Sequence, residues 1–561
     1  MQGGIIKSIC FFTFCFISIH SYAQDINFEW NKLLGTTGHS FGSALANDSE
    51  GFIYAVGAFE GVLEFDDTVL TSAGGKDGYL FKLDTLGNLL WSKQFKSFGD
   101  VHITSLTVDH ENNILVLGDY RSKVNFDTQL TTNNTDTLYS SNMFIAKYSP
   151  SGDMEWAKNT GGVAHSGNSL TIDSDNEILI SGRSVDVQFF DTTTYVTTLD
   201  SILQMSQSGE YYWYYFHPKV GFLAKYTAGG EKIWVKKAGG NAENIIVDSG
   251  DNIIVTGFFM GDTYFDNVLI PKIGFITSFL AQYDTDGDLN WVKTSGGSSG
   301  DNSGYGLAVD TLGNIYQSGQ ISGNDIEFDG NVIMPFAGVD AFVAKYDGGG
   351  NLIWYKLIGS PTTMTGESNF NSGNSLKIDG SGDIWMVGYF MDDLTFNGIN
   401  LQSYGAPDLM LLKFNPEGNV TAASQLTSFG WVSGTDLTID ANDRMYVTGF
   451  TSLESWNSND PEYIFIGKIN QDLTTGIFDS VDYSDAFNVM IYPNPASGKV
   501  HIELPYVSIQ KKIEVYTLDG RKIKELSAQD SEIEFEIKNS GVYLVLITTG
   551  DRTVVEKIVI E

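Results

Sequence analysis

Apolar and polar residues alternate along most of the chain in short runs that end at Gly, Asn or Asp. In Ser169-Leu170-Thr171-Ile172, for example, the Leu and the Ile fall on one face of an extended strand. A turn of Gly and Asn residues follows, and a second run such as Asn314-Ile315-Tyr316 begins directly after it. The pattern predicts antiparallel hairpins, and we find no helical 3.6-residue period between them.

These hairpins repeat. Two hairpins per unit predict a four-stranded antiparallel sheet, and seven units at a fixed period predict an all-β, seven-bladed β-propeller. A Lys or Gln with a Trp nine residues later marks the second hairpin in five units, and an Ala replaces the Trp in the sixth (Lys413/Ala422). The first hairpin is marked by an Asp with a Gly nine residues later, at Asp48/Gly57, Asp109/Gly118, Asp173/Gly182, Asp248/Gly257, Asp310/Gly319, Asp379/Gly388 and Asp440/Gly449.

The two ends of the repeat region complement each other. Trp30 precedes Asp48 by eighteen residues, as Trp91 precedes Asp109, so a Trp strand stands before the first unit. The seventh unit lacks this strand, because the residue nine positions after Lys468 is an Ile. We therefore expect the N-terminal strand to complete the last blade and to close the ring.

The chain begins with a pattern typical of a signal peptide. Met1 to Ala23 holds one Lys, an apolar run and small residues near its end. Cys10 and Cys15 both lie in this stretch, so disulfides and thiol chemistry are not expected in the mature chain. No later run reaches the ~20 apolar residues of a membrane helix. The predicted domains are a signal peptide (1–23), a propeller (24–470), a linker (471–486) and a C-terminal β-sandwich of seven short strands (487–561).

The net charge is −36, which argues against nucleic acid and anionic membranes as partners, since both require a basic surface. A negative charge of this size keeps a large exported protein soluble, which is one explanation. The more specific alternative is a surface that binds calcium. We predict no metal ligands and no cofactor, because no loop supplies a full ligand set. No nucleophile elbow, metal-binding His pair or phosphate-binding Gly loop is found, so no catalytic residue is assigned.

Two candidate binding sites lie on the face that carries the variable links. The first is the aromatic run 211–217 in a long insertion of the third unit, where Tyr211, Trp213, Tyr215 and His217 could contact sugar rings. An extra hairpin folded onto its own blade explains the same run without a ligand. The second is a central mouth formed by residues of the blade-to-blade links, namely His39, His165, Asp301, Glu367 and Trp431. Each of these is also explained as an ordinary loop residue.

Two resemblances to known families add to this picture. Tyr492-Pro493-Asn494-Pro495, Leu518-Asp519-Gly520-Arg521, Gly541-Val542-Tyr543-Leu544 and Lys557-Ile558-Val559 resemble, in order, the motifs of the type A C-terminal sorting domain of type IX secretion cargo. The units themselves resemble the bacterial β-propeller repeat family (SBBP-type repeats), which fixes no common ligand. The first resemblance implies transport across the outer membrane by the type IX machinery and release or attachment at the cell surface. It assigns the sorting signal to Pro493, Asn494, Pro495, Gly520, Arg521, Gly541, Tyr543 and Lys557.

Two functions stay open at this point. The favoured hypothesis is a secreted or surface-displayed propeller that acts as a non-enzymatic binding or adhesion module, with an extracellular glycan or protein as ligand. The alternative is a secreted polysaccharide-active enzyme, a hydrolase or a lyase, that uses the same loop face.

Overall fold

The computed structural model describes residues 21–560 as β-strands and their connections. It leaves out 23, 26–27, 122, 127–129, 134–141, 160–164, 185–187, 190–192, 195–199, 206–210, 217–219, 298–299, 324, 329, 334, 337, 361–369, 392, 397–398, 404–405, 429, 453–461, 471–489, 493–498, 504–510, 518–520, 529–531 and 550–551. Within the described part of the chain, no helix is long and apolar enough to cross a membrane.

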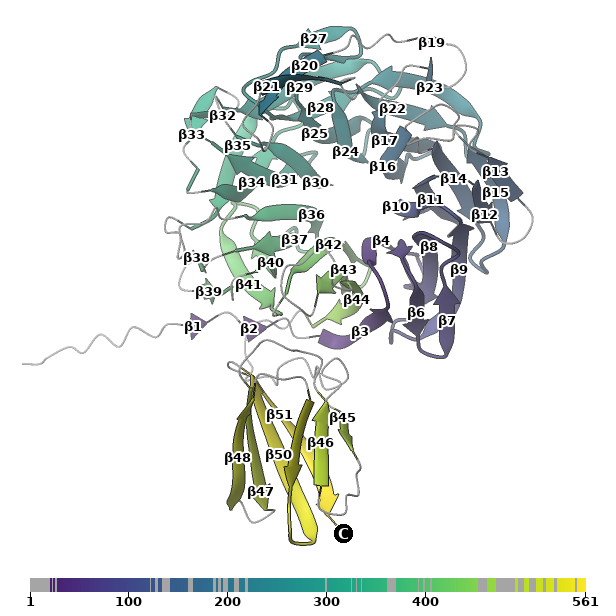
Figure 1. Ribbon diagram of the computed structural model, residues 1–561. Coiled ribbons are helices and arrows are strands. Elements are labelled where there is room, and N and C mark those ends of the chain that lie inside the picture. The colour runs from purple at the N-terminus through teal and green to yellow at the C-terminus, as the bar shows by residue number, and fades with distance from the viewer. Residues whose placement is uncertain are drawn as a thin grey trace, which may run out of the picture.

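Seven antiparallel sheets follow one another along the chain and lie around a common centre (Figure 1). They are consistent with propeller blades, and we number them sheets 1 to 7. Their first strands, at the centre, are β4 (Phe41–Asn47), β10 (Val101–Val108), β16 (His165–Ile172), β24 (Asn241–Val247), β30 (Ser303–Val309), β36 (Ser372–Ile378) and β42 (Val432–Ile439). Their second strands are β5 (Ile53–Phe59), β11 (Ile114–Tyr120), β17 (Ile178–Ser184), β25 (Ile253–Phe259), β31 (Ile315–Ser322), β37 (Ile384–Phe390) and β43 (Met445–Ser452).

The third and fourth strands lie further out. The third strands are β8 (Asp77–Leu83), β14 (Asn142–Tyr148), β22 (Val220–Tyr226), β28 (Thr277–Tyr283), β34 (Val339–Tyr346), β40 (Asp408–Phe414) and β44 (Glu462–Ile469). The fourth strands of sheets 1 to 6 are β9 (Leu89–Ser97), β15 (Met154–Asn159), β23 (Lys232–Lys237), β29 (Leu289–Gly296), β35 (Leu352–Ile358) and β41 (Val420–Leu426). The fourth strand of sheet 7 is β3 (Phe28–Thr36), which pairs antiparallel with β44.

The repeated Asp forms the same turn in all seven sheets, and the third-strand Lys lies within 4 Å of it in sheets 1, 2, 3, 5 and 6. In each unit the Asp follows the first strand, and its Oδ1 accepts hydrogen bonds from the backbone N–H groups two and four residues later, as Asp109 does from Glu111 and Asn113. Its Oδ2 faces the Lys of the third strand, at 2.8 Å from Lys147 Nζ to Asp109. Burial alone would raise the pKa of Asp109, but the hydrogen bond from Lys147 holds it below its ordinary value. The repeat signature is therefore a turn joined to a buried ion pair.

The repeated Trp joins neighbouring sheets. Trp91 of sheet 1 donates from Nε1 to the carbonyl of Pro150 in sheet 2, at 3.3 Å. A Cβ added to Gly152 of the same turn, whose φ is +87°, would lie 3.1 Å from the Trp91 ring, so the turn and the ring are in close contact. Trp354 of sheet 5 makes the equivalent bond to Pro416 of sheet 6, at 3.1 Å.

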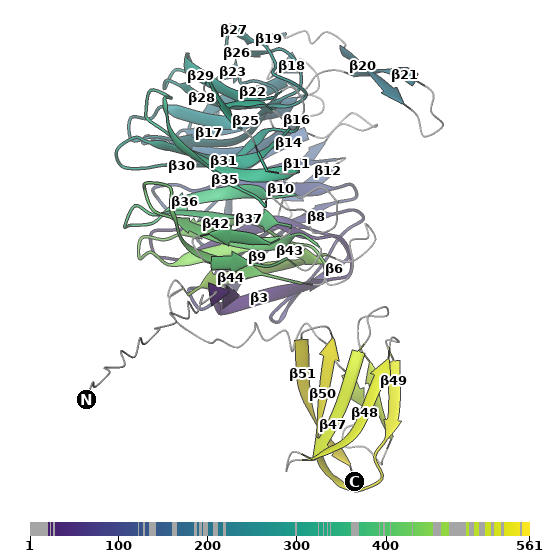
Figure 2. The ribbon, with the colours of Figure 1, turned by 90° about the vertical axis from the view of Figure 1, so that its left-hand side faces the viewer.

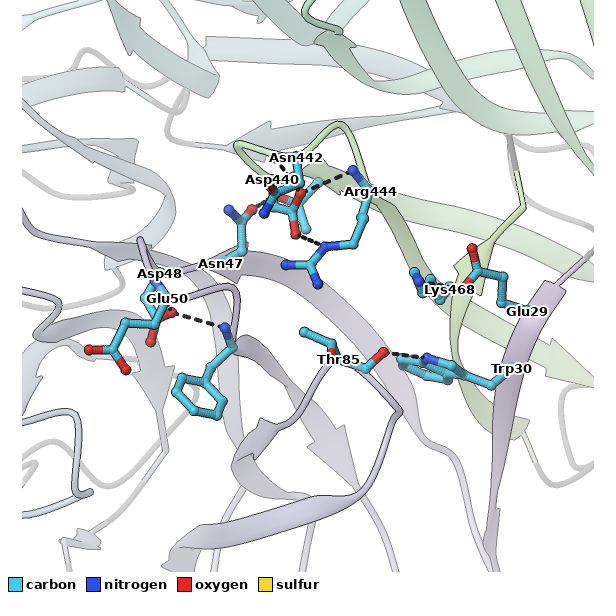
Figure 3. A network of polar contacts seen from close by, with 12 residues as sticks. Glu29, Trp30, Asn47, Asp48, Glu50, Thr85, Asp440, Asn442, Arg444 and Lys468 are labelled. Carbon is cyan, nitrogen blue, oxygen red and sulfur yellow. Dashed lines mark hydrogen bonds and ion pairs between the residues drawn. The ribbon is translucent and has the colours of Figure 1, made fainter. Parts of the chain in front are cut away.

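The same contact is found where the two ends of the ring region meet. Trp30 of β3 donates from Nε1 to the Thr85 carbonyl of sheet 1 at 3.0 Å, and its ring packs on Gly87 (Figure 3). Lys468 of β44 pairs with Glu29 beside Trp30. Between the first strands, Thr435 Oγ1 donates to the Gly42 carbonyl at 2.7 Å. The Trp30 bond is thus of the same kind as the Trp91–Pro150 and Trp354–Pro416 bonds.

Several sheets have more than the four strands that the sequence predicts. The links between second and third strands form hairpins, and three of those described pair with the fourth strand of the preceding sheet, which would otherwise present an open edge. Thus β6 pairs with β3, β12 with β9 and β32 with β29. The hairpins are β6 (Val62–Phe65) with β7 (Thr68–Thr71), β12 (Lys123–Phe126) with β13 (Leu130–Asn133), β26 (Thr263–Phe265) with β27 (Val268–Ile270), β32 (Ile326–Phe328) with β33 (Asn331–Ile333), and β38 (Leu394–Phe396) with β39 (Ile399–Leu401).

Short segments occupy two further edges. β1 (Ser21–Tyr22) pairs in parallel with β39, and β2 (Gln24–Asp25) pairs in parallel with β41 of sheet 6. The insertion of the third unit forms β18 (Gln188–Phe189) with β19 (Thr193–Thr194), and β20 (Asp200–Met205) with β21 (Tyr211–Phe216). Neither of these hairpins pairs with a strand of a numbered sheet.

The C-terminal part holds the seven short strands that the alternation predicts. β45 (Met490–Tyr492), β46 (Lys499–Glu503) and β49 (Glu532–Glu536) form one sheet. β47 (Lys511–Thr517), β48 (Lys522–Ala528), β50 (Gly541–Thr549) and β51 (Arg552–Ile560) form a second. Alternate residues of both sheets, among them Val500, Phe535 and Val545, share one buried core, as the two layers of a sandwich do.

Candidate functional site

Every first strand carries a β-bulge at the same place. The pairing of first and second strands shifts by one residue five positions before the repeat Asp, so one residue per sheet is left out of the ladder. All seven of these residues line one central cavity, and all seven are polar. We call them the bulge ring: Ser43, Thr104, Asn168, Glu243, Tyr305, Asn374 and Thr435.

The cavity is large enough for a small ligand. Its volume is about 480 Å³, and first strands of all seven sheets contribute to its wall. Asp436 and Lys377 add one charge of each sign. Asp436 is held in place by the Ser375 hydroxyl, at 2.7 Å, and by the Leu45 backbone N–H, at 2.9 Å.

Part of the bulge ring also links neighbouring sheets. Asn168 Nδ2 donates to the Ala242 carbonyl at 3.0 Å, and Asn374 Nδ2 donates to the Gly434 carbonyl at 2.8 Å. These amides still offer a carbonyl oxygen to the cavity. Burial raises the pKa of Tyr305, and the nearby charges of Glu243 and Asp301 act in the same direction, so the phenol stays a neutral donor.

A second set of residues lies one strand further out. The residue after the repeat Gly, on the second strand, pairs with the residue two positions before the bulge. Except for the buried Ala58, these residues are half-buried. We call them the rim: Ala58, Asp119, Arg183, Phe258, Gln320, Tyr389 and Phe450.

The rim is aromatic on sheets 6 and 7. Trp431 lies between Tyr389 and Phe450, with ring centroids 5.9 Å and 5.5 Å away and both pairs edge to face. The Trp431 backbone N–H donates to Ser452 Oγ at 2.9 Å, which fixes the link that carries the ring. Half-buried rings of this kind offer an apolar face on which a sugar ring can stack.

The rim is charged on sheets 2 and 3. His102 Nδ1 lies 3.8 Å from Asp119 Oδ2, and His102 Nε2 is buried with no hydrogen-bond partner. Burial raises the pKa of Asp119 to about 7, although the charges of Arg183 and Arg121 oppose the shift. Burial also lowers the pKa of His102, helped by the charges of Lys76 and Arg121.

Two of the predicted mouth residues, Trp431 and Asp301, lie near the rim and the bulge ring. Trp431 contacts the rim, Asp301 acts on the Tyr305 phenol, and His39 Nδ1 lies 3.7 Å from Glu462 Oε2. Only the backbone of His165 is described, at the start of β16, and Glu367 lies outside the described residues. The assignment of these residues to a ligand site stays a prediction. The bulge ring and the rim were missed, although their fixed spacing from the repeat Asp and Gly is readable in the sequence.

The predicted aromatic run forms β21, in register with β20, where Trp213 pairs with Leu203. The hairpin is not folded onto its own blade as a further strand, and Figure 2 shows it standing apart from the sheets. The side chains of Tyr211, Trp213 and Tyr215 are outside the part of the chain whose side chains are described, as is the whole of His217. Their role in binding stays a prediction.

Among the described residues, no three His, Cys, Asp or Glu side chains lie close enough together to hold a metal ion. Asp284, which begins a calcium-like sequence, accepts from the backbone of Asp286 at 3.0 Å and of Asp288 at 2.9 Å, as the turn Asp residues do.

The sorting-signal residues lie on the C-terminal sheets where they are described. The Arg521 backbone N–H donates to Thr517 Oγ1 at 3.2 Å, and the Tyr543 hydroxyl donates to the Asn539 carbonyl at 2.9 Å. Gly541 begins β50 and Lys557 lies in β51, with a side chain outside the description. Pro493, Asn494, Pro495 and Gly520 lie outside the described residues.

Residues 490–561 match the family model described as a secretion system C-terminal sorting domain. This match confirms the resemblance seen in the four C-terminal motifs. The chain is exported by type IX secretion, and its destination is the cell surface or the medium.

The repeat region has more distant relatives. An uncharacterised WD repeat-containing protein of Acanthamoeba polyphaga mimivirus is 23% identical over 412 residues, which is 60% of this chain and 29% of the relative. The match therefore spans under a third of that relative. A fungal alcohol oxidase in complex with copper aligns over 94% of this chain and 99% of its own, at 12% identity and a TM-score of 0.35. PorZ, a surface component of the type IX secretion system of Porphyromonas gingivalis, aligns over 93% of this chain and 81% of its own, at 11% identity and a TM-score of 0.21. Similarities this low carry no argument about activity.

Proposed function

We propose that this chain is a secreted or surface-displayed, non-enzymatic binding protein whose ligand is a glycan bound at the rim of the central cavity. The observation that supports this most is that the described part of the chain has both the Trp431 aromatic group, which contacts the rim, and a central cavity lined by the all-polar bulge ring. Aromatic faces stack on the apolar faces of sugars, and amides and hydroxyls satisfy sugar hydroxyls without a charge.

The affinity expected of such a site is modest. One exposed stacking contact contributes about 0.5–1.5 kcal/mol, so Trp431, Tyr389 and Phe450 together would give weak binding to a single sugar. Several hydrogen bonds in the cavity, or several displayed copies on one surface, raise this to a useful avidity. An adhesion module has this character, since it holds a repetitive polymer at many points.

We also propose that the seven sheets form a closed seven-bladed propeller. Three contacts support it: the pairing of β3 with β44, the packing of Trp30 on Gly87, and the hydrogen bond from Thr435 to Gly42. A closed ring is needed by the binding proposal, because the cavity wall is assembled from all seven first strands. Deleting 24–34 should open the ring and lower the melting temperature sharply, and an unchanged melting temperature would contradict closure.

A panel of soluble polysaccharides tests the binding proposal. The secreted chain is scored for retention on each polysaccharide and for new reducing ends or unsaturated products. Retention without products is expected for the wild type, and it should be lost in the rim variant Tyr389→Ala/Phe450→Ala. The matched control is the triple variant Y211A/W213A/Y215A, which removes the aromatic strand and should leave retention unchanged.

Each other outcome has a clear meaning. Loss of retention in the triple variant, with the rim variant unaffected, would move the site to β21 and contradict the rim. Formation of new ends by the wild type would show the alternative, a polysaccharide-active enzyme. Retention on no polysaccharide would contradict a glycan ligand altogether.

A further inference from the structure

The charged part of the rim has an unusual composition for this protein. The chain has a net charge of −36, and residues 24–470 contain three Arg, at 121, 183 and 444. Two of these, Arg121 and Arg183, act on the same carboxylate, Asp119, and Lys76 and His102 lie in the same group. Four basic side chains are thus gathered at one sector of an otherwise acidic molecule.

Not all of these basic side chains have an ion-pair or hydrogen-bond partner in the part of the chain that the structure describes. Arg121 is exposed and pairs with Asp100 at 3.2 Å. Arg183 is half-buried on β17 and forms no hydrogen bond or ion pair within 4 Å in the described part of the chain, although the Asp119 charge acts on it from the neighbouring sheet. The His102 ring lies tilted against Phe41, with ring centroids 5.7 Å apart, and its Nε2 has no hydrogen-bond partner among the described residues. An unpaired guanidinium beside a single shared carboxylate suits a second carboxylate.

We propose that Arg183, with His102 and Lys76 in support, binds the carboxylate of an acidic sugar, so that the ligand at the rim is a uronic-acid-containing glycan. This rests on the proposed function and names the ligand class. A glycan chain of several sugars would place a carboxylate at Arg183 on sheet 3, and other sugars of the chain could extend toward the aromatic group on sheets 6 and 7. A polymer of uronates offers both anionic groups and apolar ring faces, which suit the charged and the aromatic parts of the rim.

Asp119 competes with such a ligand. Below about pH 7 the Asp119 carboxyl is protonated, so its negative charge no longer opposes the approach of an external anion to Arg183. Above pH 7 the ionised carboxylate neutralises Arg183 and repels the ligand. The groups that face this pair are Asp100 and Arg121 beside Asp119, and Lys76, Asp100 and Arg121 beside His102. His102 gains its charge only at lower pH and then acts in the same direction. A uronate, with a pKa near 3.5, stays ionised throughout.

The test measures the affinity of the full exported chain for trigalacturonate and for neutral maltotriose at pH 6 and pH 8, by calorimetry. Trigalacturonate should bind more tightly than maltotriose at pH 6, and about tenfold more tightly at pH 6 than at pH 8. Asp119→Asn should bind at pH 8 as the wild type does at pH 6. Arg183→Gln should lose roughly tenfold for trigalacturonate and nothing for maltotriose.

Lys158→Gln is the matched control, because it removes one positive charge from a solvent-exposed pair with Glu231 outside the rim. It should change neither affinity. Binding of maltotriose with no preference for trigalacturonate would overturn the acidic ligand and leave the proposed function standing. Binding of neither saccharide would overturn both. Trialanine, which offers a peptide carboxylate, should not bind, and tighter binding of it than of trigalacturonate would overturn the sugar class.

Discussion

The seven units agree at the positions that hold the sheets together and differ at the positions around the central cavity. The turn Asp occurs in all seven, and its Lys partner lies within 4 Å in sheets 1, 2, 3, 5 and 6. The bulge ring instead holds hydroxyls, amides, one carboxylate and one phenol. The turn Asp and the bulge residue each stand at a fixed position in every unit. Their place in the backbone therefore does not explain why the first is constant and the second varies.

The difference follows from what each position contacts. The Asp–Lys pair and the Trp–Gly contact are made within the repeat or to the next copy of it, so each unit needs the same partner as the last. A bulge side chain lines space shared by all seven sheets, and although Asn168, Asn374 and Thr435 bond to a neighbouring sheet, they do so with backbone carbonyls, so no single residue type is required there. Repetition therefore serves stability, and variation is where specificity can arise.

Removal of a framework charge should have the largest effect. The Lys147 and Asp109 side chains are 8% and 1% exposed, so Lys147→Met leaves a buried carboxylate without its cation. We expect a loss of about 3–5 kcal/mol in the free energy of unfolding, measured by urea titration. Lys158→Met, which breaks the exposed pair with Glu231, should cost under about 1 kcal/mol. Equal losses would contradict a framework role for the buried pair.

The seam between sheets 7 and 1 should be the next most sensitive. Trp30→Ala removes a half-buried ring and its bond to Thr85, and should cost about 3 kcal/mol. Trp91→Ala, at the matching place between sheets 1 and 2, should cost a similar amount. A much smaller loss for Trp30 would show that β3 is not equivalent to the other fourth strands.

Asp119 of the rim should make the stability of the folded chain depend on pH. Its folded pKa is raised to about 7, so the folded chain keeps a proton between about pH 4 and pH 7 that the unfolded chain has released. The free energy of unfolding therefore carries no penalty from Asp119 below about pH 4, and it falls as the pH rises from about 4 to 7. Asp119→Asn should match the wild type near pH 4 and exceed it by up to about 4 kcal/mol at pH 8, in thermal unfolding. An unchanged difference across this range would rule out the raised pKa.

The bulge ring should be the least sensitive to substitution. Ser43→Ala removes a hydroxyl that faces the cavity and should change the free energy of unfolding by less than about 0.5 kcal/mol. Binding to the glycan found in the panel should weaken, because the cavity loses a donor and an acceptor. A loss above 2 kcal/mol would place Ser43 in the framework.

Much of this architecture could be predicted from the sequence. The Asp–Gly and Lys–Trp spacings located the four strands of each unit, and the unmatched Trp30 located the strand that pairs with β44. The extra hairpins could not be predicted in the same way, because a turn such as Asp66, with φ of +49°, is readable but its pairing with a neighbouring sheet is not.

The candidate site was harder to predict. Arg183 and Asp119 are 64 residues apart in the sequence, and only the ring brings them together. The unusual concentration of aromatic residues at 211–217 suggested a binding site there instead. A cavity built from one residue of each repeat gives no signal in any single stretch of sequence. It becomes apparent only when the seven units are aligned and the positions at which they differ are compared.

Two tryptophans give the most direct test of the account. Trp431 belongs to the rim and Trp91 to the framework, and each is changed to Ala in the exported chain. Glycan affinity and the free energy of unfolding are then measured on the same samples. We predict that Trp431→Ala abolishes retention on the panel glycan with a stability loss under about 1.5 kcal/mol, and that Trp91→Ala keeps the affinity while losing about 3 kcal/mol. Full retention by the Trp431 variant, or loss of binding in a folded Trp91 variant, would contradict the division between framework and rim.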